Sequence, residues 1–236
     1  MKRWVMPLVA AAGAAVGGGA IWSYDRVASP GGADRARIER VVHDYVLANP
    51  EIIPQAMQRL QDRESGKLVA ANRAAITTPF GSAWSGNPKG DVTVVEYFDY
   101  NCGYCRASLP MIADLLARDR GIRIVYRDMP ILTETSRDAA RASLAAAQQG
   151  KFQAFHDALY AAGPVSAATI AAAGARAGIA PAPDAAAIDT EIARNLETAS
   201  KLGMTGTPSW VIGDRVLSGA LPVEELERAV AAARGR

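Results

Sequence analysis

The chain contains only two cysteines, and both lie in one tetrapeptide, Cys102-Gly103-Tyr104-Cys105. This count excludes a framework of several disulfides and a zinc site with four thiolates. Two intervening residues let the sulfurs meet across one helical turn, so a disulfide can form and break with little backbone movement. The two histidines of the chain lack ligand spacing to this motif. A redox-active pair is therefore the favoured interpretation.

The segments around the cysteines predict a strand, a helix and a second strand. Residues 91–98 (DVTVVEYF) form a β-branched and aromatic run, and residues 121–127 (GIRIVYR) alternate apolar and charged side chains. Between them, apolar residues recur at helical spacing. If Cys102 begins this helix, free backbone amides and the helix dipole stabilise its thiolate. We therefore expect Cys102 to be the nucleophile and Cys105 to lie one turn deeper.

Glu96 lies in the middle of the first predicted strand, before the cysteine motif. A carboxyl group at this position could sit under the helix near Cys105 and take its proton during resolution of a mixed disulfide. A solvent-exposed face of the strand is the alternative. The position of Glu96 in the sequence does not decide between a buried carboxyl group near Cys105 and a solvent-exposed one.

The region after the second strand predicts a helical insertion and then a hairpin. From 134 to about 201 the sequence is Ala-rich and helical, and Gly and Pro interrupt it to give four short helices. Residues 209–212 and 215–218 predict two strands joined by a Gly-Asp turn, and a last helix follows. Thr207-Pro208 precedes the hairpin, and in isolation this dipeptide favours an ordinary turn over a cis bond.

The N-terminal third has a different organisation. Lys2 and Arg3 precede eighteen residues without a charge, which is typical of an export signal or a retained anchor. Both outcomes place the rest of the chain in an extracytoplasmic space. The predicted segments are a signal peptide or membrane anchor at 1–26, a helical oligomerisation segment at 33–76, a linker at 77–90 and a catalytic domain at 91–236.

The helical segment has an apolar stripe that needs a partner. Asn49-Pro50 divides it into two amphipathic helices, because Pro lacks a donor and disfavours helix in the residue before it. About 40 residues cannot bury such a stripe alone, so it docks on the next domain or on copies of itself. Of these two possibilities, self-association is the more specific prediction. The stripe contains Ile38, Val42, Tyr45, Ile53, Met57 and Leu60.

Composition gives no sign of a nucleic-acid partner. Lys and Arg total 26 against 24 Asp and Glu, for a net charge of +2. No run of five like charges occurs, so the chain lacks the basic footprint of nucleic-acid binding. Half of the residues are hydrophobic, which is enough to bury a core.

The segments GDVTVVEYFDYNCGYC and TGTPSWVIGDRVLSG, with the helical block between them, resemble the DsbA-like branch of the thioredoxin superfamily. The resemblance implies an α/β thioredoxin fold with a helical insertion. It also implies that Cys102 attacks disulfides, that Cys105 resolves the mixed disulfide, and that Glu96 is the buried carboxylate of the family. A cis Thr207-Pro208 loop is expected to lie against the cysteines and hold the substrate backbone.

Residues 34–75, with YVLANPEIIPQAMQRLQ, resemble the N-terminal extension of suppressor-of-copper-sensitivity oxidoreductases and related periplasmic proteins. This resemblance implies a periplasmic homo-oligomer assembled through that segment. The uncharged Gly-Tyr dipeptide, in place of the Pro-His of strong oxidants, favours isomerase or reductase activity over pure oxidase activity. The expected localisation is periplasmic, secreted through the leader or tethered to the inner membrane by it.

The expected function is thus protein thiol-disulfide exchange with client proteins that contain cysteines. No organic cofactor is expected, because the Cys102–Cys105 disulfide itself carries two electrons. A membrane redox partner is implied, since an isomerase must be kept reduced and an oxidase oxidised. A Cu(I)-binding or copper-tolerance module using the same thiolates is the alternative, and a non-catalytic scaffold is a third. The expected substrate-binding residues are Gly103, Tyr104, Thr207 and Pro208.

Overall fold

The computed structural model describes residues 32–181 and 184–235, and the chain divides into two compact units, residues 1–59 and 60–236. The predicted signal peptide or anchor at 1–26 lies outside the described residues. Within the described ranges, no helix has the length and apolar character needed to cross a membrane.

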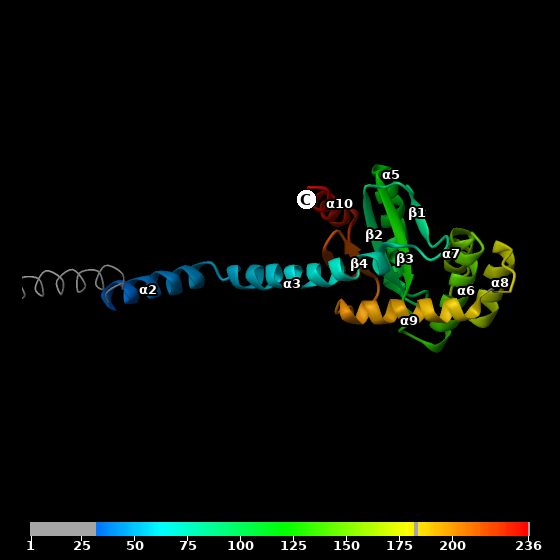
Figure 1. Cartoon of the computed structure of the whole chain (residues 1–236), viewed down its shortest axis with the longest axis horizontal. Helices are drawn as coiled ribbons and strands as arrows, with labels where there is room; N and C mark the ends of the chain where they lie inside the picture. The colour runs from blue at the N-terminus through cyan, green and yellow to red at the C-terminus, as the bar shows by residue number, and fades with distance from the viewer. Residues whose placement is uncertain (1–31, 182–183, 236) are drawn as a thin grey trace, which may run out of the picture. The chain divides into compact units, whose positions relative to one another are not determined.

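The first unit contains α2 (Gly32–Ala48) and the beginning of α3 (Ile52–Ala71), coloured blue to cyan in Figure 1. The backbone N–H and the side-chain amide of Asn49 both donate to the carbonyl of Tyr45 at 2.9 Å, which ends α2. The two helices predicted on either side of Asn49-Pro50 are therefore present. Their apolar side chains are more than half exposed at Ile38, Val41, Val42, Tyr45, Leu47, Ile53 and Met57.

A five-stranded sheet forms the centre of the second unit, with strand order β1-β3-β2-β4-β5. β2 and β3 are parallel, as expected for a strand, helix, strand unit, and the other neighbouring pairs are antiparallel. α5 (Gly103–Arg118) makes the crossover from β2 to β3. The strands are β1 (Trp84–Gly86), β2 (Val92–Phe98), β3 (Ile122–Asp128), β4 (Ser209–Ile212) and β5 (Arg215–Ser218).

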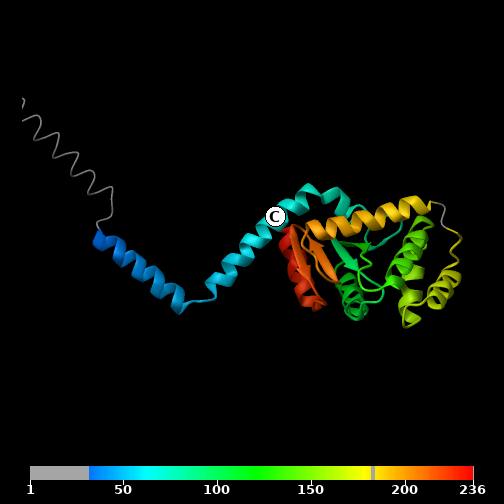
Figure 2. The same cartoon turned by 90° about the horizontal axis from the view of Figure 1, so that it is seen from below.

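Helices cover both faces of this sheet. α5 and α10 (Val223–Arg234) lie on one face, where the main core includes Val94 and Phe98 of β2. α9 (Ala185–Lys201) lies on the other face, together with the short α4 (Arg73–Thr77), and Figure 2 shows α9 and α10 on opposite sides of the strands. β2 is therefore buried on both sides, which explains its nearly continuous apolar sequence.

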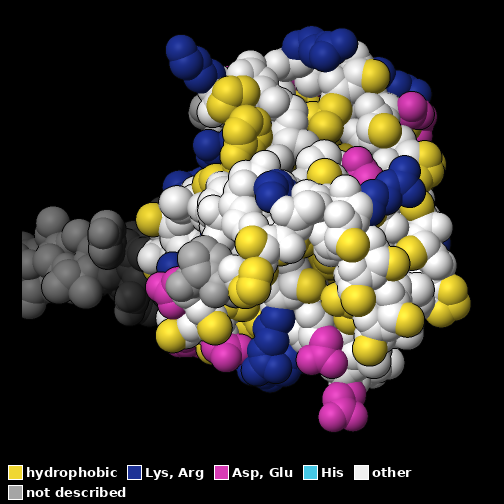
Figure 3. All heavy atoms as spheres, turned by 90° about the vertical axis from the view of Figure 1, so that its right-hand side faces the viewer, with side chains coloured by type: hydrophobic (Ala, Val, Ile, Leu, Met, Phe, Trp, Pro, Cys, Tyr) yellow, Lys and Arg dark blue, Asp and Glu magenta, His cyan; other side chains and the backbone are white. Residues whose placement is uncertain are grey.

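Across its described residues, 134–181 and 184–201, the helical insertion contains four helices, as the Gly and Pro interruptions predict. Thr133 and Ser166 form capping boxes at two helix starts, and Gly178 ends one helix with a φ of 66°, a conformation that favours glycine. Figure 3 shows the face of the molecule that lies to the right in Figure 1. On this face, Lys and Arg side chains lie in separate places among hydrophobic and other groups. The helices are α6 (Glu134–Gln148), α7 (Phe152–Ala161), α8 (Ala167–Ala177) and α9.

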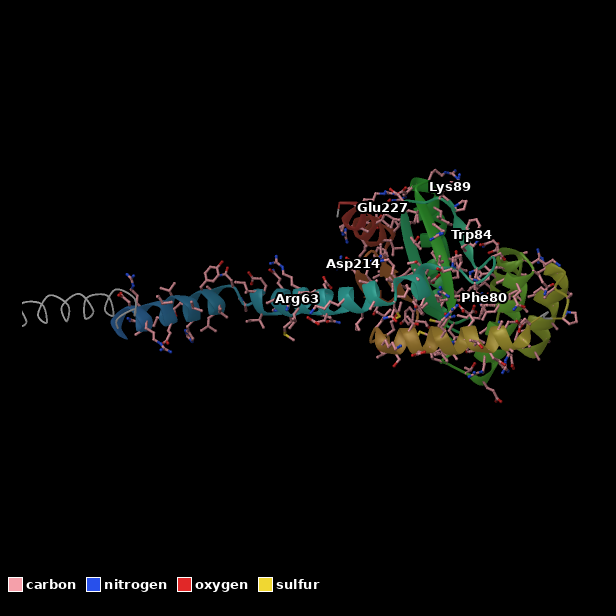
Figure 4. All side chains as sticks on the ribbon, viewed as in Figure 1. Arg63, Phe80, Trp84, Lys89, Asp214 and Glu227 are labelled. Atoms are coloured by element: carbon pink, nitrogen blue, oxygen red, sulfur yellow. The ribbon has the colours of Figure 1, made fainter. Side chains whose placement is uncertain are left out.

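The prediction of a linker at 77–90 is wrong. β1 lies within this segment and pairs with β3, and Phe80 and Trp84, labelled in Figure 4, pack against the buried cores. The glycines there serve turns rather than flexibility, because Gly81 and Gly86 have φ of 53° and 83°. The second unit therefore begins well before residue 91.

A buried arginine fixes the segment that precedes β1. Arg127 of β3 is 1% exposed and donates to the carbonyls of Ala75, Ile76 and Thr78, at the end of α4. Its guanidinium also forms an ion pair with buried Glu191 of α9. The orphan carbonyls at the end of α4 are thus satisfied by a side chain of the sheet, which attaches α4 to the second unit.

Candidate functional site

Cys102 is the N-cap residue of α5. Its backbone N–H donates to the carbonyl of Asp99 at 2.9 Å, and its sulfur accepts the backbone N–H of Cys105 at 3.3 Å. The sulfur therefore lies at the start of a 16-residue helix, where free amides and the dipole favour negative charge. Both cysteines are free thiols in this structure.

Burial distinguishes the two cysteines less than the sequence predicts. Cys102 is 6% exposed and Cys105 is 1% exposed, so the expected nucleophile is itself largely covered. Burial, followed by the nearby charge of Glu96, raises the pKa of the Cys105 thiol well above its usual range. Cys105 is therefore held in its protonated form until a base accepts the proton.

Glu96 occupies the sheet face that α5 covers. It lies opposite Tyr126 of β3 and Trp210 of β4, and it is 2% exposed. The alternative of a solvent-exposed strand face is thus excluded. Burial raises the pKa of Glu96 to about 8, and the charge of Cys102 adds to this effect. The carboxyl group lies in the electrostatic field of both cysteines and titrates near neutral pH.

The Thr207-Pro208 peptide bond is cis, as the family resemblance implies and the isolated dipeptide does not. The thiol of Cys102 donates to the carbonyl of Thr207 at 3.1 Å, which joins the cysteine turn to the loop before β4. The carbonyl of Pro208 accepts the backbone N–H of Gly219 at 2.8 Å, which fixes the loop to the end of β5. Residues 105 positions apart thereby form one site.

Gly103 and Tyr104 lie at the surface beside Cys102. A Cβ atom at Gly103 would meet no atom within 4 Å, and Tyr104 is 71% exposed. The structure therefore brings together all seven residues singled out from the sequence: Cys102, Cys105, Glu96, Gly103, Tyr104, Thr207 and Pro208.

Two polar residues of the cysteine turn were not singled out from the sequence. Asp99 is 3% exposed, and its carboxyl group accepts the backbone N–H groups of Asn101, Ile131 and Leu132 at 2.9–3.1 Å. The side-chain amide of Asn101 donates to hydroxyl groups at the start of α6. Asp and Asn next to a cysteine motif are a signal of turn formation, but their partners lie about 30 residues away and have no signal of their own.

A buried polar chain continues from the same turn into the insertion. Tyr100 donates to Ser143 at 3.1 Å, and Ser143 donates to Asp128 at 3.2 Å. Nδ1 of His156 lies 3.1 Å from the Tyr100 hydroxyl, and burial lowers the pKa of His156 to about 3. His156 is therefore neutral, which agrees with its position among aromatic rings.

Two family models match separate parts of the chain. Residues 93–231 match the family described as DSBA-like thioredoxin domain. Residues 34–65 match the copper resistance protein ScsC N-terminal domain. Among curated proteins, a Na⁺/H⁺ antiporter NhaA 3 from Salinispora tropica is 42% identical over 79 residues. This chain spans only 12% of the length of that antiporter.

Solved structures with the same fold include a thioredoxin-like oxidoreductase from Silicibacter pomeroyi, with 39% identity, a TM-score of 0.64 and coverage of 70% of this chain and 99% of that one. A linker-deletion mutant of Proteus mirabilis ScsC has 27% identity and a TM-score of 0.67, covering 86% and 96%. The thiol-disulfide exchange protein alpha-DsbA2 from Wolbachia pipientis has 28% identity and a TM-score of 0.67, covering 73% and 97%.

These matches support a redox enzyme of the thiol-disulfide exchange type. The chain belongs to the DsbA-like thioredoxin-domain family, and its N-terminal helices match the ScsC N-terminal domain.

Proposed function

We propose that the chain is a protein thiol-disulfide oxidoreductase in which Cys102 attacks and Cys105 resolves. The observation that carries this proposal is the position of the Cys102 sulfur, between the Cys105 N–H at 3.3 Å and the Thr207 carbonyl at 3.1 Å. A helix N-terminus favours the thiolate, and a cis-proline loop beside it offers backbone to an extended client.

The exchange proceeds in two steps whose electrons balance. The Cys102 thiolate attacks one sulfur of a client disulfide, which forms a mixed disulfide and releases the other client sulfur as a thiolate. The Cys105 thiol then loses its proton and attacks the Cys102 sulfur. The client leaves as a dithiol, reduced by two electrons, and the enzyme is left with a Cys102–Cys105 disulfide.

Glu96 is the proposed acceptor of the Cys105 proton. Cys105 does not ionise unaided in its buried position, and the raised pKa of Glu96 allows this carboxyl group to take and return a proton near neutral pH. In the reverse direction, the protonated Glu96 returns the proton as the Cys102–Cys105 disulfide opens.

The N-terminal helices are proposed to join several catalytic units. Support comes from the exposed apolar side chains of α2 and α3 and from the match of residues 34–65 to the ScsC N-terminal domain. Several cysteine pairs in one assembly favour repeated attack on a single misbridged client, which is the requirement of an isomerase. We infer that isomerase or reductase activity predominates over oxidase activity, in the periplasm and with a membrane redox partner.

Substitution of each cysteine tests the assignment of roles. Cys105→Ser is expected to accumulate mixed disulfides with a reduced-and-reoxidised client such as scrambled ribonuclease, because the resolving thiol is missing. Cys102→Ser is expected to accumulate none, because Cys105 is buried and protonated. Non-reducing electrophoresis and mass spectrometry measure both. Equal trapping by the two variants would contradict the assignment, and no trapping by either would favour the Cu(I)-binding alternative.

Replacement of Glu96 by Gln changes both stability and rate. Between pH 4.5 and about 8 the folded carboxyl group is mostly protonated while the unfolded one is mostly ionised, so the folded state loses stability as pH rises. Glu96→Gln removes this loss. The free energy of unfolding of the variant, relative to that of the parent, should therefore grow by up to about 1.4 kcal/mol per pH unit in that window. Resolution of a mixed disulfide should slow by about 100-fold.

Urea unfolding of the reduced protein at pH 5 to 8 and rapid-mixing kinetics measure the two effects of Glu96→Gln. Glu224→Gln, at an exposed position of α10, is the matched control, and it should follow the parent in both measurements. Parallel stability curves for the parent and Glu96→Gln, together with equal resolution rates, would show that Glu96 is not the proton acceptor.

The apolar stripe is tested by Val42→Gln/Tyr45→Gln in the full soluble chain. These side chains are 56% and 60% exposed, so their replacement should not unfold a single chain but should dissociate an assembly. Light scattering should give an oligomer for the parent and a monomer for the variant. The monomer should keep insulin reduction and lose most isomerisation of scrambled ribonuclease. Arg37→Gln on the same helix is the control, and a monomeric parent would remove the oligomer proposal.

A further inference from the structure

Arg106 directly follows Cys105 in α5, but its side chain contacts the end of a different helix. The guanidinium donates to the carbonyl of Tyr160 and, at 2.9 Å, to the carbonyl of Gly163. If α7 continued, the carbonyl of Tyr160 would accept the N–H of residue 164, which is a proline and has none. Arg106 supplies the missing donor, and its charge complements the negative end of the α7 dipole.

The same contact places the Tyr160 ring beside the cysteine turn. The guanidinium carbon of Arg106 lies 5.3 Å from the centre of this ring, a distance typical of a cation–π interaction. The ring centre also lies 5.0 Å from that of Tyr100 and 4.9 Å from that of His156. Tyr100 stands two residues before Cys102, and both belong to the main core together with Tyr160. Arg106 thus joins the first turn of α5 to the end of α7.

Tyr160 lies at the outer edge of the interior that contains Cys105 and Glu96. Its side chain belongs to a residue that is 4% exposed, whereas Ala161 and Ala162, which follow it, are exposed. Burial raises the pKa of the Tyr160 phenol, and the charges of Glu96 and Cys105 add to this effect. The ring therefore lies close to the two groups that exchange a proton and separates them from solvent at the end of α7.

We propose that Arg106 is a positioning residue for the resolving step: by binding the end of α7, it holds the Tyr160 ring over Cys105 and Glu96 and excludes water from them. This inference rests on the proposed function, because it concerns the proton transfer between those two groups. Burial is the main cause of the raised pKa of both. A carboxyl group that keeps a high pKa is the stronger base, and it accepts the Cys105 proton more readily.

The other groups around Glu96 do not supply a compensating charge. His156 of α7 and Asp128 of β3 are neutral, because burial lowers the pKa of the first and raises that of the second. Trp210 of β4 does not titrate, and the buried residues of α10 are apolar. The titratable groups that share the electrostatic field of Glu96 are Cys102, Cys105, Tyr126 and Tyr160.

The sign of the effect distinguishes exclusion of water from a direct effect of the Arg106 charge. A positive charge favours a carboxylate, so loss of the charge alone would raise the pKa of Glu96. Entry of water also favours the carboxylate, so loss of the cover would lower this pKa. Removal of Arg106 therefore shifts the titration of Glu96 in opposite directions under the two explanations.

Titration of the Glu96 carboxyl group in the reduced protein tests the proposal without depending on catalysis. Carboxyl groups of Glu are labelled with ¹³C, and the Glu96 signal in NMR spectra is identified by its loss in Glu96→Gln. The parent should titrate with a midpoint near pH 8. Arg106→Met loses both hydrogen bonds and should lower the midpoint by at least about one pH unit, which is about a tenfold change in proton affinity. The pH profile of mixed-disulfide resolution should shift in the same direction.

Conservative variants separate positioning from general damage. Arg106→Lys should titrate closer to the parent than Arg106→Met does, because an ammonium group can still donate to a carbonyl at the end of α7. Tyr160→Phe keeps the ring and should keep the midpoint, whereas Tyr160→Leu should lower it. Arg118→Met is the matched control, because Arg118 also lies in α5 and contacts another helix, donating to Glu227 of α10 at 3.4 Å. This control should keep the parent midpoint.

The failures of the two proposals differ. An unchanged midpoint in Arg106→Met would show that Arg106 only stabilises the end of α7, and a raised midpoint would show that it acts through its charge. Either result overturns the exclusion of water. A parent in which Glu96 titrates near the usual 4.5 would overturn it as well, together with the role of Glu96 as proton acceptor. Failure of Cys105→Ser to trap a client would instead overturn the proposed function, and the titration would still report whether Arg106 excludes water.

Discussion

The site depends on one contact between distant parts of the chain, the approach of the Cys102 sulfur to the carbonyl of Thr207 at 3.1 Å. Two separate structural features of the fold meet at this contact. The crossover from β2 through α5 to β3 places Cys102 at a helix N-terminus. β4 is the neighbour of β2 in the sheet, and the cis Thr207-Pro208 loop that precedes β4 therefore lies next to Cys102. Neither feature alone would give a thiol both a stabilised negative charge and a backbone surface for a client.

Burial then gives the two cysteines and Glu96 different tasks. The helix start favours negative charge at Cys102, whereas the interior under α5 keeps the Cys105 thiol protonated and raises the pKa of Glu96 to about 8. The same desolvation that makes Cys105 a poor nucleophile makes Glu96 a usable proton acceptor near neutral pH. The different roles of the two cysteines thus follow mainly from their positions, with Cys102 at the N-cap of α5 and Cys105 within its first turn.

Local sequence was sufficient for the elements around the cysteines. Strand, helix and hairpin signals from 91 to 236 correspond to β2 through α10, because each has its own periodicity or turn residues. The side of Glu96 was not predictable, since β2 is buried on both faces and alternation carries no information there. The linker was misjudged because the turn glycines that surround an edge strand also occur in flexible segments.

Long-range partners are the other part that the sequence did not reveal. Asp99 and His156 acquire their surroundings from segments about 30 to 56 residues away. The cis bond at Pro208 was implied by family resemblance only, since the dipeptide itself favours trans. Sequence patterns are local, and these features are set by tertiary packing.

Equilibration of the protein with glutathione buffers of defined ratio, followed by acid quenching, thiol alkylation and mass spectrometry, tests the central claim most directly. A Cys102–Cys105 pair with the proposed function should pass reversibly and in one two-electron step between dithiol and intramolecular disulfide. A pair that remains reduced across the whole series, or that ends as two separate glutathione adducts, would contradict the account.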